Sequence, residues 1–168
     1  MSLRECPHFM STGRNMSHYI HGSDPAEQSR LSRLNDLINS RYFPTLQLED
    51  GLRILDVGSG LGQLTYRMSE AVGPNGFCLG IERDVGQLTV ASKNYVASNL
   101  EFRQGDALKA DISAATVVTL YMLPSFNKLL RPMLEKQLKS GARVVVHDYP
   151  IEGWNPVRWE EMPLMDTR

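Results

Sequence analysis

One acidic residue and three glycines stand close together in the segment 54–63, Ile-Leu-Asp-Val-Gly-Ser-Gly-Leu-Gly-Gln. A short apolar run ends at Asp56, and Gly58, Gly60 and Gly62 then alternate with other residues before a helical pattern begins. This order predicts a strand, a tight turn and the first turn of a helix. Such a turn presents bare backbone N–H groups to a nucleotide-like ligand at the positive end of the helix dipole.

The identity of that ligand depends on how the segment departs from the dinucleotide-binding fingerprint. The fingerprint, Gly-x-Gly-x-x-Gly, requires a third glycine at the position that Gln63 occupies here. We expect Asp56 to point into the crevice at the end of its strand, where its carboxylate repels a diphosphate and attracts a cation. S-adenosylmethionine (SAM) has no phosphate and carries a sulfonium and an ammonium group. The pattern therefore favours SAM over a nicotinamide dinucleotide, and disfavours an oxidoreductase.

Two further acidic residues follow the next two predicted strands. Glu82 comes after the apolar segment 77–81 and lies 24 residues beyond Gly58, near the spacing of an acid that binds ribose hydroxyls. Asp106 follows the predicted strand 100–104. Because the carboxyl ends of parallel strands meet at one edge of a sheet, we expect these acids to line the same crevice as the glycine turn.

The rest of the chain alternates predicted strands and helices, which indicates an α/β fold. The apolar runs 115–123 and 142–147 supply a fourth and a fifth strand, and helices are expected over about 84–97 and after Pro124. Pro132 is expected to break the last helix into two short ones. Right-handed crossovers then give a three-layer α/β/α sandwich with a parallel sheet.

The 168 residues are long enough for one domain, preceded here by an arm. Residues 1–23 have little periodicity and are expected to form this N-terminal arm. Asp24-Pro25-Ala26-Glu27 has the composition of a helix start and opens the domain 24–168. The cysteine and the three histidines of the arm match no zinc-site spacing, so no metal is expected.

Composition and charge disfavour several classes of function. A net charge of −1 gives no electrostatic case for binding long nucleic acid. No apolar run approaches the roughly 20 residues of a membrane span, and the first residues contain no apolar signal core. Cys6 lies in the arm and Cys78 in a predicted core strand, so no disulfide between them is expected. These features indicate a cytoplasmic protein.

The segment 56–62 resembles motif I of class I SAM-dependent methyltransferases. Residues 19–84 look like general methyltransferase-domain proteins. Residues 101–158 are similar to a narrower group, the bacterial and archaeal relatives of the mitochondrial ATP-synthase c-subunit lysine methyltransferases. The narrower resemblance rests on Phe-Arg-Gln-Gly-Asp at 102–106, Leu-Tyr-Met-Leu-Pro at 120–124 and Val-Val-Val-His-Asp-Tyr-Pro at 144–150.

This resemblance implies a Rossmann-like parallel sheet of strand order 3-2-1-4-5. It also implies SAM-dependent methyl transfer to an acceptor that stays open, with a protein lysine as one candidate. A non-catalytic SAM-binding or interaction subunit with the same fold is the alternative. The methionine end of SAM is expected on the glycine turn, the ribose on Glu82 and the adenine on Asp106 and the residue after it. The expected cofactor-binding residues are Tyr19, Asp56, Gly58, Ser59, Gly60, Gln63, Glu82, Arg83, Asp106, Ala107 and Tyr121.

His147, Asp148 and Tyr149 end the fifth predicted strand at the rim of the same crevice. A histidine, an acid or a tyrosine at that place can deprotonate or orient a nucleophile. These three residues are therefore the catalytic candidates. A rim histidine that Asp148 holds for structural reasons alone is the alternative.

The C-terminal hairpin of the class I fold is expected to be incomplete. The family normally adds a sixth and a seventh strand, whereas only 18 residues follow Pro150, enough for one strand over 157–162. The fifth strand would then be an uncovered edge, which favours association. We expect a homodimer through this edge, or a monomer of reduced stability, with Trp154 and Trp159 covering the edge or the interface.

Overall fold

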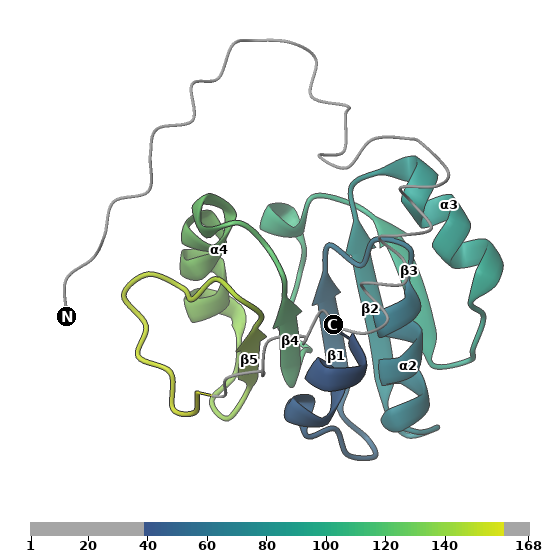
Figure 1. Ribbon diagram of the computed structural model, residues 1–168, viewed down its shortest axis with the longest axis horizontal. Helices are drawn as coiled ribbons and strands as arrows, with labels where there is room; N and C mark the ends of the chain where they lie inside the picture. Colours follow the sequence, from purple (N-terminus) through teal and green to yellow (C-terminus); the bar gives the residue numbers. More distant parts are fainter. Residues whose placement is uncertain (1–38, 160–168) are drawn as a thin grey trace, which may run out of the picture. The chain divides into compact units, whose positions relative to one another are not determined.

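The structure is a computed structural model, and it describes residues 39–159. Its strands are β1 (Arg53–Val57), β2 (Phe77–Glu82), β3 (Leu100–Gln104), β4 (Val117–Leu120) and β5 (Arg143–Val146). They form one parallel sheet of order β3-β2-β1-β4-β5, seen from right to left in Figure 1. The predicted sheet and its strand order are confirmed.

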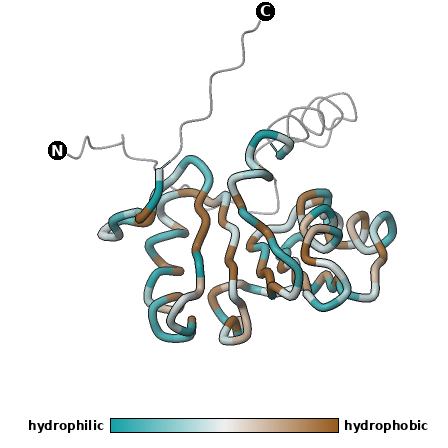
Figure 2. The backbone as a smooth tube through the Cα atoms, turned by 90° about the horizontal axis from the view of Figure 1, so that it is seen from below, coloured by the Kyte–Doolittle hydropathy of each residue, from teal (hydrophilic) through white to brown (hydrophobic). Residues whose placement is uncertain are grey.

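Helical segments cover both faces of this sheet. They are α2 (Gln63–Ala71), α3 (Val85–Asn94), α4 (Pro124–Gln137) and the 3-10 helices η1 (Phe43–Leu46) and η2 (Ala107–Lys109). Successive side chains of a strand point to opposite faces. Leu55 of β1 accordingly shares a core with Leu130 of α4, whereas Ile54 shares another with Met68 of α2 and Leu46 of η1. The fold is therefore the predicted three-layer sandwich, in which hydrophobic stretches alternate with hydrophilic turns along the chain (Figure 2).

Several predicted elements differ from the structure. The prediction that Pro132 breaks the last helix is wrong, because α4 runs through it. A proline removes one helical hydrogen bond, here to the carbonyl of Lys128, and both residues are exposed, so water can replace that bond. β4 is shorter than the predicted strand and leaves residues 121–123 outside the sheet. α3 ends at Asn94, because Tyr95 after it adopts an extended conformation.

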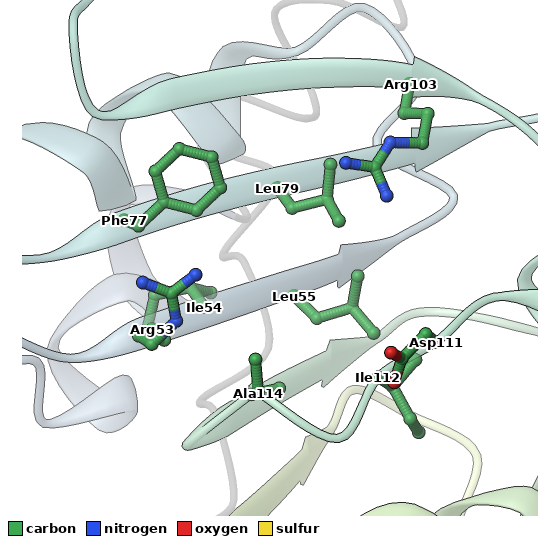
Figure 3. A pocket seen from close by; sticks show the side chains of 10 residues that line it. Arg53, Ile54, Leu55, Phe77, Leu79, Arg103, Asp111, Ile112 and Ala114 are labelled. Atoms are coloured by element: carbon green, nitrogen blue, oxygen red, sulfur yellow. The ribbon is translucent and has the colours of Figure 1, made fainter.

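The connection between β3 and β4 contains only the short helix η2. Part of the sheet face that carries α4 is therefore not covered by an α-helix. A hollow of about 150 Å³ lies there, along Phe77 and Leu79 of β2 (Figure 3). Its two arginines already have partners. The guanidinium of Arg53 lies 5.2 Å from the ring centroid of Phe77, and Arg103 is paired with Glu101 at 2.7 Å. No predicted site residue lines this hollow.

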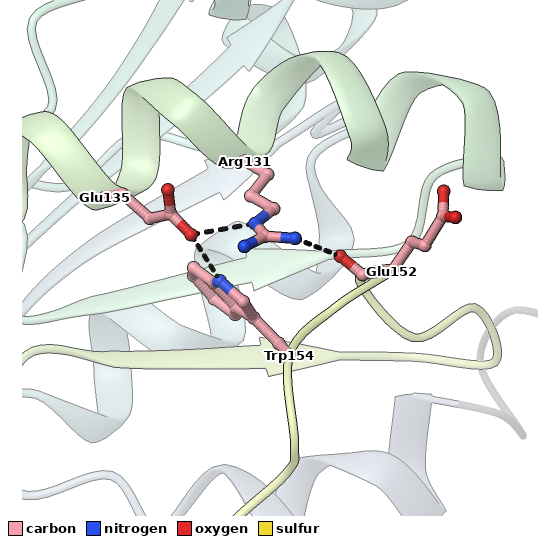
Figure 4. A network of polar contacts seen from close by, with 4 residues as sticks. All are labelled: Arg131, Glu135, Glu152 and Trp154. Carbon is pink, nitrogen blue, oxygen red and sulfur yellow. Dashed lines mark hydrogen bonds and ion pairs between the residues drawn. The ribbon is translucent and has the colours of Figure 1, made fainter.

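The segment after β5 is fastened to α4 by a polar network (Figure 4). Arg131 donates to the Glu135 carboxylate at 2.8 Å and to the Glu152 carbonyl at 2.7 Å. The indole N–H of Trp154 donates to the same Glu135 oxygen at 2.8 Å, and its ring packs against the core beneath α4. Of the two tryptophans expected to cover the edge, Trp154 is thus held on the α4 side, and Trp159 is 66% exposed.

Within residues 39–159 the sheet has five strands, and β5 is one of its two edges. Residues 157–159 form no strand, so the first part of the strand expected over 157–162 is not present, and its remainder lies outside the described residues. The arm 1–23 with Tyr19, and the helix start at Asp24, also lie outside them. In the described part of the chain no helix is both long and apolar enough to cross a membrane. The described residues also contain no group of three potential metal ligands.

Candidate functional site

The glycine turn, residues 58–62, directly follows β1, and its backbone requires glycine. Gly58, Gly60 and Gly62 have φ values of +75°, +55° and +83°, a region that other residues rarely adopt. A Cβ at Gly62 would also lie only 2.8 Å from Ala91 of α3 and 2.6 Å from Phe102 of β3. The alternation of glycines is therefore explained by backbone conformation, and at the third position also by close packing.

The N–H groups of Gly58, Ser59 and Gly60 are directed into the protein, which corrects the expectation of bare donors at these positions. Gly58 and Ser59 both donate to the Ile81 carbonyl, at 2.9 and 3.2 Å. Gly60 donates to Oε2 of Glu82 at 2.9 Å. A diphosphate would need these donors for itself. Because the protein already uses them, the turn suits a ligand without phosphate.

Glu82, the last residue of β2, holds the turn from the side. It is 9% exposed. Its Oε1 accepts the N–H groups of Arg83 and Asp84 at 2.8 Å each, and its Oε2 accepts that of Gly60. A carboxylate offers about four acceptor positions, so these three backbone bonds leave room for a ligand hydroxyl. The geometry is compatible with the expected binding of a ribose.

Asp56 lies beneath the turn, and the prediction that it points into the open crevice is wrong. It is 6% exposed, because it stands on the face of β1 that α2 covers. Oδ2 accepts a hydrogen bond from the Thr65 hydroxyl at 2.6 Å, and Oδ1 one from Thr119 at 2.8 Å. Burial raises the pKa of Asp56, the two hydroxyl bonds lower it, and the charge of Glu82 raises it further. A cationic ligand above the turn would stabilise this buried charge.

Whether SAM fits at the glycine turn can be tested on two observations. The Ser59 hydroxyl lies against Gly80, is buried and has no hydrogen-bond partner among the described residues. A buried polar group of this kind indicates a missing partner such as a ligand. Beside it, a Cβ at Gly60 would meet only the side-chain oxygen of Gln87, at 3.2 Å. Open space at Gly60, an unbonded hydroxyl and a buried carboxyl group together fit a cationic ligand that carries hydroxyl groups.

The third acid completes the row at the end of β3. Asp106 is exposed, and its Oδ1 accepts the N–H of Leu108 at 3.0 Å, which caps η2. The N–H of Gly105 donates to the Glu82 carbonyl at 3.0 Å, so the ends of β2 and β3 are joined. Ala107 beside them is 6% exposed. The acids expected for ribose and adenine therefore stand next to each other.

The remaining predicted cofactor residues flank this row. Gln63 is the first residue of α2 and is half-buried, and Arg83 is exposed directly after β2. Tyr121 follows β4 and is 54% exposed. Tyr19 lies outside the described residues. All the described members thus stand at the carboxyl edge of the parallel sheet, where ligands of such folds bind.

A second group of side chains, the rim group Tyr121, His147 and Asp148, lies beyond β4 and β5 at the same edge. The His147 ring is 7% exposed and packs edge-on against Tyr121, with ring centroids 4.6 Å apart, and against Tyr42 at 5.0 Å. Its Nε2 lies 3.6 Å from Oδ1 of Asp148. Burial lowers the pKa of His147, although the Asp148 charge raises it. Burial also raises the pKa of Tyr121, and Asp148 adds to this through its charge and a hydrogen bond.

The backbone at Asp148 adopts an uncommon conformation. Its φ is +63°, and the N–H of Tyr149 donates to the His147 carbonyl at 2.8 Å. A three-residue turn around a non-glycine residue of positive φ is rare and strained. The Asp148 side chain is half-exposed, and Tyr149 is 38% exposed. The three catalytic candidates therefore lie on one short, strained turn, with the histidine inside and the other two facing solvent.

Several site residues escaped the sequence analysis. Thr65 and Thr119 bind Asp56 although they are 9 and 63 residues away from it. Met122 covers the turn, since a Cβ at Gly58 would lie 2.9 Å from its sulfur. A hydroxyl inside a buried strand, as at Thr119, is the kind of signal that could have been noticed. The position of Met122 follows only from the three-dimensional packing.

The sheet order, the glycine turn and the row of acids define the class I SAM-dependent methyltransferase architecture. Residues 56–158 match the family model of the ANTKMT methyltransferase domain. Because this match covers more than half of the 168 residues, the chain belongs to that family of SAM-dependent methyltransferases.

Individual relatives agree on methyl transfer and differ in acceptor. A "Protein-lysine N-methyltransferase" of Saccharolobus islandicus (strain REY15A) is 38% identical over 109 residues, which cover 61% of this chain and 66% of that protein. A "Demethylmenaquinone methyltransferase" of Lactococcus lactis subsp. lactis is 36% identical, over 66% of this chain and 47% of that protein. The chain thus spans about half to two thirds of the length of these curated relatives.

One solved structure is similar over most of its length. It is described as an RNA methyltransferase from Salinibacter ruber in complex with S-adenosyl-L-homocysteine. It is 41% identical, has a TM-score of 0.69, and the match covers 75% of this chain and 84% of that chain. A precorrin-6y C5,15-methyltransferase from Geobacter metallireducens, 22% identical with a TM-score of 0.59, shares the fold.

Proposed function

We propose that this chain transfers the methyl group of SAM to a lysine side chain of a protein. The observation that carries the proposal is the placement of the rim group. Tyr121, His147 and Asp148 stand at the same sheet edge as the glycine turn, and Met122 joins the two by packing on Gly58. The similarity to a protein-lysine methyltransferase at 38% identity supports the class of acceptor.

In this proposal the cofactor residues divide by the part of SAM that they hold. The turn residues Gly58, Ser59 and Gly60 face the methionine end, with Gln63 beside them and Asp56 buried beneath the turn. Glu82 binds the ribose hydroxyls, with Arg83 next to it. The adenine lies on Asp106 and Ala107, and Tyr121 is placed between cofactor and acceptor. The buried carboxyl group of Asp56 and the unbonded Ser59 hydroxyl support this arrangement.

Bound SAM supplies an activated methyl group on a positively charged sulfur. The residues of the chain then align the lysine nitrogen with that methyl and exclude water from it. The lysine must first lose its proton, which costs about 4–5 kcal/mol at pH 7 from an ordinary pKa of 10.4. Asp148 offers a half-exposed carboxylate as the proton acceptor, and the imidazole of His147 lies 3.6 Å from it. Tyr149 is the third candidate to orient the amine.

Two other functions remain as alternatives with distinct supporting observations. An RNA acceptor is favoured by the similarity to the Salinibacter ruber protein, and disfavoured by the net charge of −1. A SAM-binding subunit without catalysis is favoured by the sheet of the described residues, in which β5 is a free edge where a partner can bind.

A labelled-methyl assay separates these possibilities. Protein and SAM with a radioactive methyl group are incubated with a whole-cell extract, and the extract is then treated with ribonuclease or with protease. We expect label that resists ribonuclease, is released by protease and appears as methyl-lysine after acid hydrolysis. Asp148→Asn serves as the matched control and should lower transfer while SAM binding remains. Label in RNA, or binding of SAM without any transfer, would contradict the proposal.

We further propose that the chain forms a homodimer through β5 in the cytoplasm. Arg143 and His147 direct their N–H groups toward β4, so those of Val144 and Val146 point outward, where a second copy can pair. Light scattering should then report a dimer that Val144→Pro converts to a folded monomer. A reducing compartment is supported by Cys78, a buried free thiol whose pKa burial raises to about 12.

A further inference from the structure

Asn127 lies near the start of α4, and its side chain joins two segments that are far apart in the sequence. The residue is fully buried. Its amide nitrogen donates to the Tyr149 carbonyl at 2.8 Å and to the Met122 carbonyl at 3.3 Å. Only the nitrogen of an asparagine amide can donate to carbonyls, so the orientation of the amide follows from its partners.

Both carbonyls belong to the segments that carry the rim group. Tyr121 directly precedes Met122, and Asp148 directly precedes Tyr149. The bond to Tyr149 holds the chain one residue beyond the strained turn at Asp148, which needs such support from its surroundings. The bond to Met122 holds the segment that packs on Gly58 of the glycine turn.

The other half of the amide is unused. Oδ1 of Asn127 is buried and has no hydrogen-bond partner among the described residues. A buried acceptor without a partner is unfavourable, and an apolar residue of similar size would avoid it. The presence of asparagine at this place is therefore explained by the two carbonyls that its nitrogen holds.

We propose that Asn127 is a positioning residue for methyl transfer. By holding the Met122 and Tyr149 carbonyls together, it fixes the positions of Tyr121 and Asp148 relative to each other beside the glycine turn. This consequence rests on the proposed function, because Asn127 itself is buried and is placed to act through its neighbours. A misplacement of about 1 Å can lower a rate by about a hundredfold. The substitution of Asn127 should therefore affect transfer far more than cofactor binding.

The test compares Asn127→Asp with a matched control, Asn99→Asp. Asn99 makes the same kind of bridge just before β3, at the opposite end of the sheet, where its nitrogen donates to the carbonyls of Ser69 and Gly73 at 2.8 Å each. In both variants a carboxylate of nearly the same size replaces the two-donor amide. Asn127→Ser keeps one donor and is the milder variant should the aspartate fail to fold.

Three quantities are measured on the full chain. They are the kcat/KM for transfer to protein from labelled SAM, the dissociation constant of S-adenosyl-L-homocysteine by calorimetry, and hydrogen exchange of the segments 121–123 and 147–150. For the Asn127 variant we expect transfer to fall at least about tenfold, cofactor affinity to stay within about threefold, and exchange to rise in both segments. Asn99→Asp should leave transfer and the exchange of these two segments unchanged.

Equal losses of transfer in the two variants, or unchanged transfer in a folded Asn127 variant, would overturn the inference. A loss of cofactor affinity in proportion to the loss of transfer would do the same. If the wild-type chain transfers no methyl group to protein, the proposed function fails, and hydrogen exchange alone decides on Asn127. Faster exchange in both segments of the Asn127 variant then supports the positioning, and unchanged exchange refutes it.

Discussion

At the scale of residues, the site contains two nearly buried carboxylates with different surroundings. Glu82 binds three backbone N–H groups at the side of the glycine turn. Asp56 binds two hydroxyls beneath the turn. The first arrangement holds the turn and leaves an acceptor position for a ligand hydroxyl. The second holds a buried carboxyl group below the place where a cationic ligand would lie. The two acids should therefore respond differently to substitution.

Glu82→Ala is expected to weaken SAM binding at least about tenfold. The substitution removes the proposed hydrogen bond to the ribose, worth about 1.5–3 kcal/mol for a charged acceptor, and the acceptor that holds Gly60. Calorimetric titration measures the effect. The control is Glu101→Ala, which removes an exposed partner of Arg103 within β3 and should leave the affinity unchanged. Equal affinity of the wild-type protein for SAM and NAD would contradict the assignment of the cofactor.

Asp56→Asn should change how stability depends on pH. Burial raises the pKa of Asp56, so the folded protein binds a proton there more strongly than the unfolded chain does. The contribution of Asp56 to the free energy of unfolding is therefore fully present below its pKa in the unfolded chain, about 3.9. This contribution is lost as pH rises through its higher pKa in the folded protein. Urea unfolding from about pH 4 to 8 should show wild-type stability falling relative to the variant. A constant difference between the two proteins across that range would contradict this explanation.

At the scale of elements, the strands and the glycine turn were predictable because their signals are local. The apolar runs and the alternating glycines of residues 58–62 occupy consecutive positions, and the strand order was expected from the resemblance to class I methyltransferases. The contacts that shape the site are not local. Thr119 is 63 residues from Asp56, and Tyr149 is 22 residues from Asn127. The continuity of α4 through Pro132 depends on exposure to water, which the sequence does not show.

Gly60→Val should abolish SAM binding while the protein stays folded. Gly60 has a φ of +55°, which a β-branched residue adopts only with strain, and its N–H anchors the turn to Glu82. Gly141→Val is the matched control. Gly141 has a φ of +88° with open space around it, and it lies in the turn before β5, at the other end of the sheet.

Calorimetry and circular dichroism measure the pair of glycine variants. Both variants should lose some stability through backbone strain, but only the first should lose the cofactor. If Gly60→Val bound SAM as well as Gly141→Val does, the glycine turn would be required for folding alone.

At the scale of the whole domain, the two sides of β5 are stabilised in different ways. Its inner side pairs with β4, and its outer side is a free sheet edge among the described residues. The segment that follows it is held by α4 through Arg131, Glu135 and Trp154, and Ile151 of this segment is buried in the core beneath α4. The polar network thus holds the segment that follows β5 and the rim group in place, through contacts within a single chain.

Trp154→Ala is expected to lower the free energy of unfolding by about 2 kcal/mol, because it removes a half-buried indole and its hydrogen bond to Glu135. Trp159→Ala is the control. That ring is 66% exposed, so its loss should change stability by no more than about 0.5 kcal/mol. Urea unfolding gives both values, and light scattering on the same samples gives the oligomeric state. If Trp154→Ala kept its stability and dissociated a dimer, the indole would belong to an interface between copies instead of holding the segment to α4.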